Sequence, residues 1–246
     1  MVCVTGGGGG VGRAIVERFA AAGDRVVALG RAEHALREAA AGAAGSEVSV
    51  AVLDVTDEDG VERVFGEIGR VDVLVNNAGI AVGAPLQRVS LSEWEAHLRV
   101  NATGAFLCTR AVLPQMRDRG FGRIVMVAST AAHVGAPYTS AYTASKHAVV
   151  GLMRAVAAEV AGSGVTANAV CPAYIRTPMT TATIERIVQT TGRTEAEAEA
   201  ALIEKSPLER FLEPEEVAAT IEFLASPETA AINGQTIVLD GGAVQR

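Results

Sequence analysis

The chain has 246 residues, of which 49% are hydrophobic and 20% charged, and its formal net charge is −7. This length allows one large domain with a sizeable core, and no apolar run approaches the roughly 20 residues that a membrane-spanning helix needs. Because the basic residues are scattered rather than grouped in a stripe, we expect a single domain over residues 1–246 with neither a membrane nor a nucleic-acid partner.

The first predicted elements are a buried strand, a glycine-rich turn and a helix. Residues 2–5 are apolar and β-branched, six of the seven residues 6–12 are glycine, and an apolar stripe at residues 14–20 predicts the helix. Small residues let backbone N–H groups approach a pyrophosphate at the positive end of a helix. Two registers fit, Gly7-x-Gly9-x-x-Gly12 and Thr5-Gly6-x-x-x-Gly10-x-Gly12. The alternative is a flexible turn of low complexity.

The second predicted strand, residues 25–29, ends at Gly30 and Arg31. An acidic residue near this point would bind an adenine ribose, whereas an arginine accommodates a 2′-phosphate. No acid is present, so Arg31 favours NADP(H) over NAD(H). A solvated surface arginine is the alternative.

Strands and helices alternate along the rest of the chain. Apolar, β-branched runs predict strands at residues 47–54, 71–75, 123–128, 164–170 and 232–242. Helices are expected from Thr56 or Asp57 to Ile68, from about Ser92 to Arg119, from about Ala141, and from Glu213. This alternation is typical of an α/β fold of the Rossmann type, a doubly wound parallel sheet, here of seven strands, with helices on both faces.

Ligands of such folds bind at the carboxyl ends of the strands. Asp54 and the run Asn76-Asn77-Ala78-Gly79 fall at two of these ends, although Asn76-Asn77 alone would suit an ordinary turn. Ser129 follows the fifth predicted strand. Asn101 lies inside a predicted helix, where an amide is a poor helix former and usually has a specific partner.

Tyr142 and Lys146 stand at i and i+4 of a predicted helix and so share one face. A cation beside a phenol lowers its pKa, and a phenol tuned in this way can act as a general acid towards a ketone. The alternative is a buried tyrosine beside a surface lysine.

Residues from about 179 to 205 interrupt the alternation with Thr-rich and Glu/Ala-rich helical pieces. An insertion at the carboxyl edge of the sheet is well placed to close over a substrate and exclude water, so we interpret it as a small helical lid.

Cysteine and histidine spacing predicts neither a disulfide nor a metal site. Cys3, Cys108 and Cys171 are far apart, and the four histidines lack ligand spacing. The first residues run directly into the glycines without a basic region and an apolar stretch, so we expect a cytoplasmic protein.

Together these motifs resemble the short-chain dehydrogenase/reductase family over essentially the whole chain. The Thr5-Gly6-x-x-x-Gly10-x-Gly12 register looks like the family's cofactor turn, and the run 76–79 matches its strand-four motif. The thirteen-residue step from Ser129 to Tyr142 also agrees. The resemblance implies a catalytic tetrad of Asn101, Ser129, Tyr142 and Lys146.

The resemblance also implies roles for these residues. Tyr142 would donate a proton to the carbonyl oxygen as hydride arrives from the nicotinamide, and Ser129 would bind the same oxygen. Lys146 would bind the nicotinamide ribose and hold down the pKa of Tyr142, and Asn101 would position a water for proton relay. The implied cofactor-binding residues are Thr5, Gly6, Gly10, Val11, Gly12, Arg31, Asp54, Val55, Asn77, Ala78, Gly79, Tyr142, Lys146, Pro172, Ile175 and Thr177.

For the substrate, the closest likeness is to the 3-oxoacyl thioester and polyketide ketoreductase branch, through the runs 128–130, 145–147 and 168–172. We expect an NAD(P)(H)-dependent reductase of such ketones, with NADP(H) favoured. One alternative is a secondary-alcohol or 3-hydroxyacyl-CoA dehydrogenase working oxidatively. An alternative of another class is a non-catalytic regulator that binds the cofactor.

Four positions restrict the substrate and its carrier. Fatty-acid reductases of this branch dock an acyl carrier protein on two arginines, and Gly120 and Ser163 stand there, with only Arg119 close by. Ala131 and Thr139 stand where 3-hydroxybutyrate dehydrogenases clamp a carboxylate, which argues against a small free hydroxy acid. The family resemblance implies a homotetramer acting on a small-molecule carbonyl or alcohol.

Overall fold

The computed structural model describes residues 1–204 and 206–245; Lys205, at the end of the predicted lid, and Arg246 lie outside these residues. Its strands are β1 (Val2–Thr5), β2 (Val26–Gly30), β3 (Val48–Val52), β4 (Val73–Asn76), β5 (Gly122–Val127), β6 (Val165–Pro172) and β7 (Thr236–Leu239). All pair in parallel, in the order β3-β2-β1-β4-β5-β6-β7. The predicted doubly wound sheet of seven strands is confirmed.

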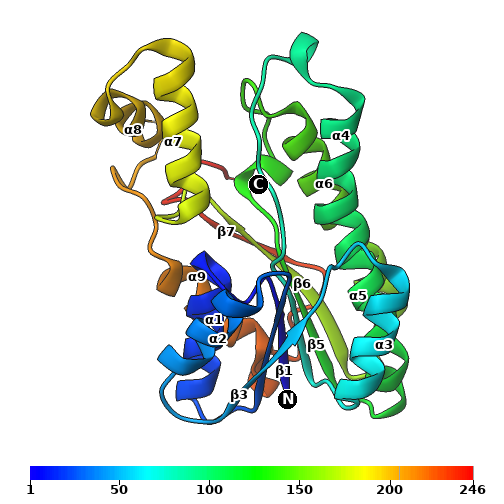
Figure 1. Cartoon of the computed structure of the whole chain (residues 1–246). Helices are drawn as coiled ribbons and strands as arrows, with labels where there is room; N and C mark the ends of the chain where they lie inside the picture. The colour runs from blue at the N-terminus through cyan, green and yellow to red at the C-terminus, as the bar shows by residue number, and fades with distance from the viewer. Residues whose placement is uncertain (205, 246) are drawn as a thin grey trace.

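Helices cover both faces of this sheet (Figure 1). They are α1 (Gly10–Ala21), α2 (Glu33–Gly42), α3 (Glu58–Ile68), α4 (Leu91–His97), α5 (Gly104–Asp118), α6 (Ser140–Glu159), α7 (Pro178–Thr191), α8 (Glu195–Ile203) and α9 (Pro214–Ala225). Alternate strand residues face opposite sides. One core therefore joins the sheet to α1, α2 and α9, and the other joins it to α3, α5 and α6.

The helix predicted from about Ser92 to Arg119 is not a uniform α-helix. A π-helical segment, Leu98–Thr103, lies between α4 and α5 and contains Asn101, and the N–H of Gly104 donates to the carbonyl of Arg99, five residues back. Such segments accommodate one extra residue in a turn and often occur at functional sites. The predicted long helical segment is confirmed, and the apolar pattern continues through its widened turn.

The last strand is shorter than the predicted 232–242. Its first residues turn back on β6 instead: Asn168 donates to the carbonyl of Ile232, and the N–H of Gln235 donates to the Asn168 side chain. Ladder pairing with β6 begins only at Thr236. The apolar run therefore predicts too long a strand, because the residues before Thr236 bond to the Asn168 side chain rather than to the β6 backbone ladder.

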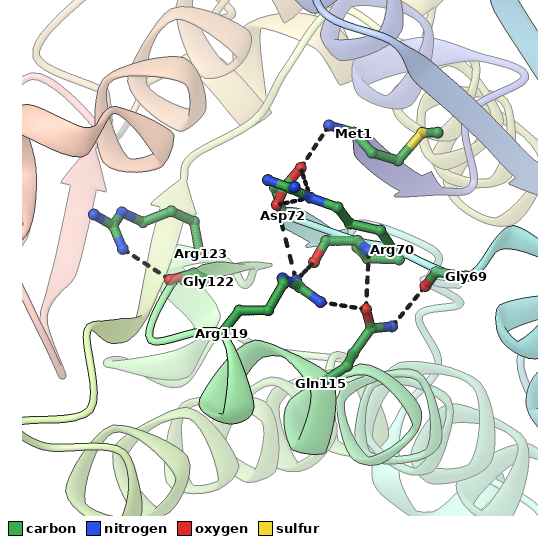
Figure 2. A network of polar contacts seen from close by, with 9 residues as sticks. Met1, Gly69, Arg70, Asp72, Gln115, Arg119, Gly122 and Arg123 are labelled. Carbon is green, nitrogen blue, oxygen red and sulfur yellow. Dashed lines mark hydrogen bonds and ion pairs between the residues drawn. The ribbon is translucent and has the colours of Figure 1, made fainter.

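At the amino ends of the central strands, a polar network ties β4 to the chain terminus and to α5 (Figure 2). Asp72 accepts from the Met1 amino group at 2.9 Å and from Arg70 at 2.9 Å. Arg119 donates to Gln115 at 2.6 Å and lies 3.8 Å from Asp72. The Arg119 guanidinium is thus engaged within the fold, at the edge of the sheet opposite the carboxyl ends of the strands.

Candidate active site

The glycine turn between β1 and α1 needs glycine at three positions. Gly6 and Gly10 have φ of +67° and +51°, which side chains disfavour. A Cβ built at Gly12 would overlap the carbonyl oxygen of Gly6 and lie 2.7 Å from Nδ2 of Asn77. Gly9, which the other register requires, has an ordinary φ of −167° and free space around its Cβ position. These features fit the Thr5-Gly6-x-x-x-Gly10-x-Gly12 register.

We predict that Gly12→Ala weakens nicotinamide cofactor binding by at least about tenfold and lowers the melting temperature. The added methyl group has to displace backbone, which costs about 1–3 kcal/mol in a well-packed site. Calorimetric cofactor titration and thermal unfolding measure both effects. Gly151→Ala is the matched control, because this glycine also lies in a helix but its Cβ position is empty. Equal behaviour of the two variants would contradict the close approach at Gly12.

Two residues at the carboxyl ends of β1 and β4 hold the turn in place. Asn77 donates through Nδ2 to the carbonyl of Thr5 at 2.9 Å and of Gly6 at 3.2 Å. The Thr5 hydroxyl accepts from the backbone N–H groups of Asn77 and Ala78, both at 3.0 Å. Four hydrogen bonds therefore join the turn to the run after β4.

Lys146 lies at the base of the site and is 6% exposed. Its ammonium donates to the carbonyl of Val127 at 2.7 Å and lies 5.7 Å from the centroid of the Tyr142 ring. A Cβ at Gly79 would be 3.7 Å from this ammonium. Burial lowers the pKa of Lys146 from 10.5 to about 8.

Tyr142 and Ser129 are brought together across β5 and α6. The Ser129 hydroxyl accepts from the N–H of Ala131 at 3.1 Å. Burial raises the pKa of Tyr142, and a hydrogen bond with Ser129 opposes that rise only in part. The expected lowering of this pKa beside a bound cofactor stays a prediction; in the protein alone the Lys146 ammonium donates to Val127, and desolvation of the phenolate dominates. The site holds the phenol in its protonated form.

The Asn101 side chain hydrogen-bonds to two residues of the protein, Ile80 and Ser145. Its Oδ1 accepts from the N–H of Ile80 at 2.8 Å, and its Nδ2 donates to the Ile80 carbonyl at 3.0 Å and to the Ser145 hydroxyl at 2.8 Å. The side chain is thus held by Ile80 and Ser145, and the expected role of Asn101 in positioning a relay water stays a prediction. Ser145 in turn donates to the carbonyl of Tyr142 at 2.7 Å.

The adenine side of the predicted cofactor site combines Arg31 with Asp54. Asp54 accepts from the N–H of Thr56 at 2.9 Å and from its hydroxyl at 2.8 Å. Chiefly the backbone bond, with a smaller contribution from the nearby Arg31 charge, lowers the pKa of Asp54. Arg31 is exposed and follows β2 directly, while Val55 and Val11 are buried beneath the site.

The segment after β6 forms the other wall. Pro172 ends the strand, and Ile175 pairs with Leu212 in an isolated parallel bridge. Thr177 caps the amino end of α7, and a Cβ at Gly10 would be 3.3 Å from its Cγ2. Of the three predicted residues of this segment, the structure thus places Thr177 beside the glycine turn.

Two polar residues of the site were missed from the sequence, Ser145 and His97. Ser145 is fully buried between Tyr142 and Lys146, and His97 is 2% exposed, four residues before Asn101. The sequence could have indicated both residues, because a serine inside a helix and a histidine on the same helix face as Asn101 usually have a hydrogen-bond partner.

Within residues 1–204 and 206–245, no group of three or more His, Cys, Asp or Glu side chains is placed to hold a metal ion. None of the helices in the described part of the chain is long and apolar enough to cross a membrane.

Comparison with known proteins identifies the family. The family model for short chain dehydrogenase matches residues 1–187. The chain is 40% identical to the 3-oxoacyl-acyl-carrier-protein reductase of Thermotoga maritima over 99% of this chain and 97% of the relative. It is 36% identical to the D-beta-hydroxybutyrate dehydrogenase of Cupriavidus necator, over 98% and 96%.

Among solved structures, actinorhodin polyketide ketoreductase with NADPH superimposes with a TM-score of 0.93 at 35% identity, covering 98% of this chain and 96% of that one. The likeness therefore extends over the glycine turn, the tetrad positions and α7–α8 alike. The chain belongs to the short-chain dehydrogenase family, whose members are nicotinamide-dependent oxidoreductases of carbonyl and hydroxyl groups in small molecules.

Proposed function

We propose that this protein reduces a ketone to a secondary alcohol with NADPH, and that the ketone is a 3-oxoacyl thioester or resembles a polyketide. The observation that carries the proposal is that the Tyr142 phenol lies near enough to the Ser129 hydroxyl at the carboxyl edge of the sheet to interact with it, with Lys146 buried beside the Tyr142 ring. A carbonyl oxygen placed against both hydroxyl groups would accept two hydrogen bonds.

The protein groups supply the proton. When bound, the nicotinamide supplies a hydride, which goes to the carbonyl carbon. Tyr142 gives its hydroxyl proton to the carbonyl oxygen, and Ser129 stabilises the charge that develops there. The raised pKa of Tyr142 favours this direction, because the phenol is protonated at neutral pH. Lys146, whose pKa is lowered to about 8, is suited to return a proton from solvent.

For the cofactor, we place the pyrophosphate on the open amino end of α1, whose cap Gly9 makes no side-chain hydrogen bond. Arg31 would take the adenosine 2′-phosphate beside Asp54 and Val55. The nicotinamide half would lie between the run 77–79 and the segment 172–177. Asn101 remains in the proposed tetrad, because its hydrogen bonds position Ile80 and Ser145.

The names of similar proteins support this substrate class, since one is a 3-oxoacyl-acyl-carrier-protein reductase and another a polyketide ketoreductase. A carrier protein is less well supported than a CoA thioester or a free ketone. Arg119 is engaged with Gln115 and Asp72 (Figure 2), and Gly120 and Ser163 offer no charge nearby.

We also propose that residues 179–205 act as a lid, within the single domain 1–246. In support, α7 and α8 share a small core of their own, built from Ile184 and Ala198 together with Phe211. This core is separate from the two that fix the sheet, so the pair of helices can move as a unit. The cytoplasmic location and the homotetramer stay predictions. Half-exposed Phe106 on α5 and Phe223 on α9 offer apolar contacts for the latter.

A second candidate is oxidation of a secondary alcohol, favoured by the likeness to D-beta-hydroxybutyrate dehydrogenase. In that direction the phenolate of Tyr142 has to accept a proton. Because burial raises the pKa of this phenol, oxidation should accelerate as the pH rises, whereas reduction should not.

The proposed function is tested by a nicotinamide-absorbance screen of ketones, acyl-CoA thioesters and alcohols with both cofactors. Turnover of 3-oxoacyl thioesters or extended ketones supports it. Tight cofactor binding without turnover of any compound would instead favour a non-catalytic regulator.

Arg31→Asp is expected to reverse the cofactor preference from NADPH to NADH. The variant loses a charge-assisted contact with the 2′-phosphate, and the new carboxylate repels that phosphate. Together these effects should lower kcat/KM for NADPH by about 10²-fold. Arg37→Asp, at an exposed position on α2 where Arg37 pairs with Glu33, is the control and should keep the preference. Equal or better turnover with NADH in the parent protein would contradict the assignment of Arg31.

A further inference from the structure

The loop that leaves β4 is held by every second backbone N–H group. Residues 77–85 form no helix or strand, yet the N–H groups of Ile80, Val82 and Ala84 all have partners. Ile80 donates to Oδ1 of Asn101 at 2.8 Å, and Val82 donates to Nε2 of His97 at 3.0 Å. Ala84 donates to the carbonyl of Tyr138 at 2.8 Å. We name residues 80–84 the clamped loop.

The hydrogen bond from the Val82 N–H to His97 requires that Nε2 of the imidazole carry no hydrogen. Its Nδ1 lies 2.7 Å from the carbonyl oxygen of Glu93, which can only accept, so Nδ1 carries the hydrogen. Nε2 is then free of hydrogen and accepts from Val82. The ring is 2% exposed and lies one turn before Asn101. The two side chains therefore accept from backbone N–H groups two residues apart in the same loop, those of Val82 and Ile80.

Both ends of the clamped loop border the candidate chemistry. At its start, Gly79 lies against Asn101 and Lys146, where an added Cβ would be 3.2 Å and 3.7 Å from their polar atoms. At its end, Tyr138 has a φ of +68°, an unfavourable value for a tyrosine, while its carbonyl bonds Ala84. A displacement of Val82 is therefore passed to the lysine on one side and to the loop before α6 on the other.

We propose that His97 is a positioning residue for the reaction and that it makes the clamped loop sensitive to acid. The proposal rests on the proposed reductase function and goes beyond its tetrad. When the imidazole takes up a second proton, Nε2 becomes a donor and faces the N–H of Val82, so this hydrogen bond is lost. Only the bonds of Ile80 and Ala84 then hold the loop, so a displacement of Val82 reaches both of its ends.

Several groups near the imidazole influence this change. Glu93 on α4 attracts the imidazolium, and Arg186 on α7 lies near enough to Glu93 to weaken that attraction. Tyr138 and Ser140 line the same small cavity as His97, and they add hydroxyl groups rather than charge. On α6, the charge nearest the clamped loop is Lys146, beside Gly79. Glu93 is thus the carboxylate among the residues that line this small cavity.

The test compares two variants of the whole protein with a control. In His97→Gln an amide oxygen that takes up no proton replaces the acceptor, and in His97→Leu the volume is kept without an acceptor. We expect His97→Gln to retain kcat at pH 7.5 and to lose less activity than the parent at pH 5.5. His97→Leu should lower kcat about tenfold at both pH values. His147→Gln changes an exposed histidine on α6 that bonds only its own helix, and should behave as the parent.

Amide hydrogen exchange of the peptide spanning residues 80–84 gives a second readout that needs no substrate. Exchange, corrected for its intrinsic pH dependence, should be slow in the parent and in His97→Gln at pH 7.5, and fast in His97→Leu. An identical acid profile in the parent and His97→Gln, or equal exchange in all three proteins, would overturn the proposal. If the parent turns over no ketone, the proposed function fails. Hydrogen exchange still tests whether His97 holds Val82 in place.

Discussion

Replacing Tyr142 with phenylalanine is expected to lower kcat for ketone reduction by about 10²–10⁴-fold, the range typical of losing a general acid. The substitution removes only the hydroxyl that interacts with Ser129 and keeps the ring, whose centroid lies 5.7 Å from the Lys146 ammonium. Cofactor affinity should be unchanged, because the glycine turn and the run 77–79 are untouched. Steady-state kinetics and cofactor fluorescence titration separate the two effects.

A parallel measurement in the oxidative direction sharpens this expectation. The parent should oxidise alcohols faster as the pH rises, since its buried phenol has a raised pKa and must ionise first. The phenylalanine variant should lose that dependence together with its rate. Undiminished turnover by the variant in either direction would show that another group carries the proton.

The fold was predictable because its signals are local and repeat along the chain. Each buried strand is a short β-branched run, and the glycine turn follows the first of them directly. The register of that turn was open from the residues alone, since six glycines satisfy both patterns. Only the path of the backbone shows that Gly6 and Gly10 need positive φ and that Gly12 faces the Gly6 carbonyl.

The site was less predictable, because its side chains take partners that are distant in sequence. Spacing at i and i+4 places Lys146 beside Tyr142, but it does not reveal that the ammonium bonds Val127. Apolar periodicity likewise hides the π-helical turn that directs Asn101 towards Ile80. The sequence thus predicts candidate reacting groups, and only the structure shows which groups hold them in place.

Lys146→Met is expected to stabilise the cofactor-free protein at pH 7 while lowering kcat by about 10²-fold or more. The folded state carries the cost of a buried ammonium, which is why the pKa of Lys146 falls from 10.5 to about 8. Methionine fills a similar volume without charge. The full pKa difference corresponds to roughly 3 kcal/mol. Because the bond to Val127 is lost as well, a gain of about 1–2 kcal/mol is expected.

The pH dependence of this gain distinguishes burial of charge from a packing effect. Below pH 8 the lysine is charged in both states and the variant has its full advantage. Between about pH 8 and 10.5 the unfolded parent still holds a proton that the folded parent has released, so the parent gains stability as the pH rises and the advantage of the variant disappears. Arg154→Met, which removes an exposed cation from the same helix, should show no such trend in thermal or urea unfolding. A constant difference between Lys146→Met and the parent from pH 7 to 10 would show that the ammonium is not buried as a charge.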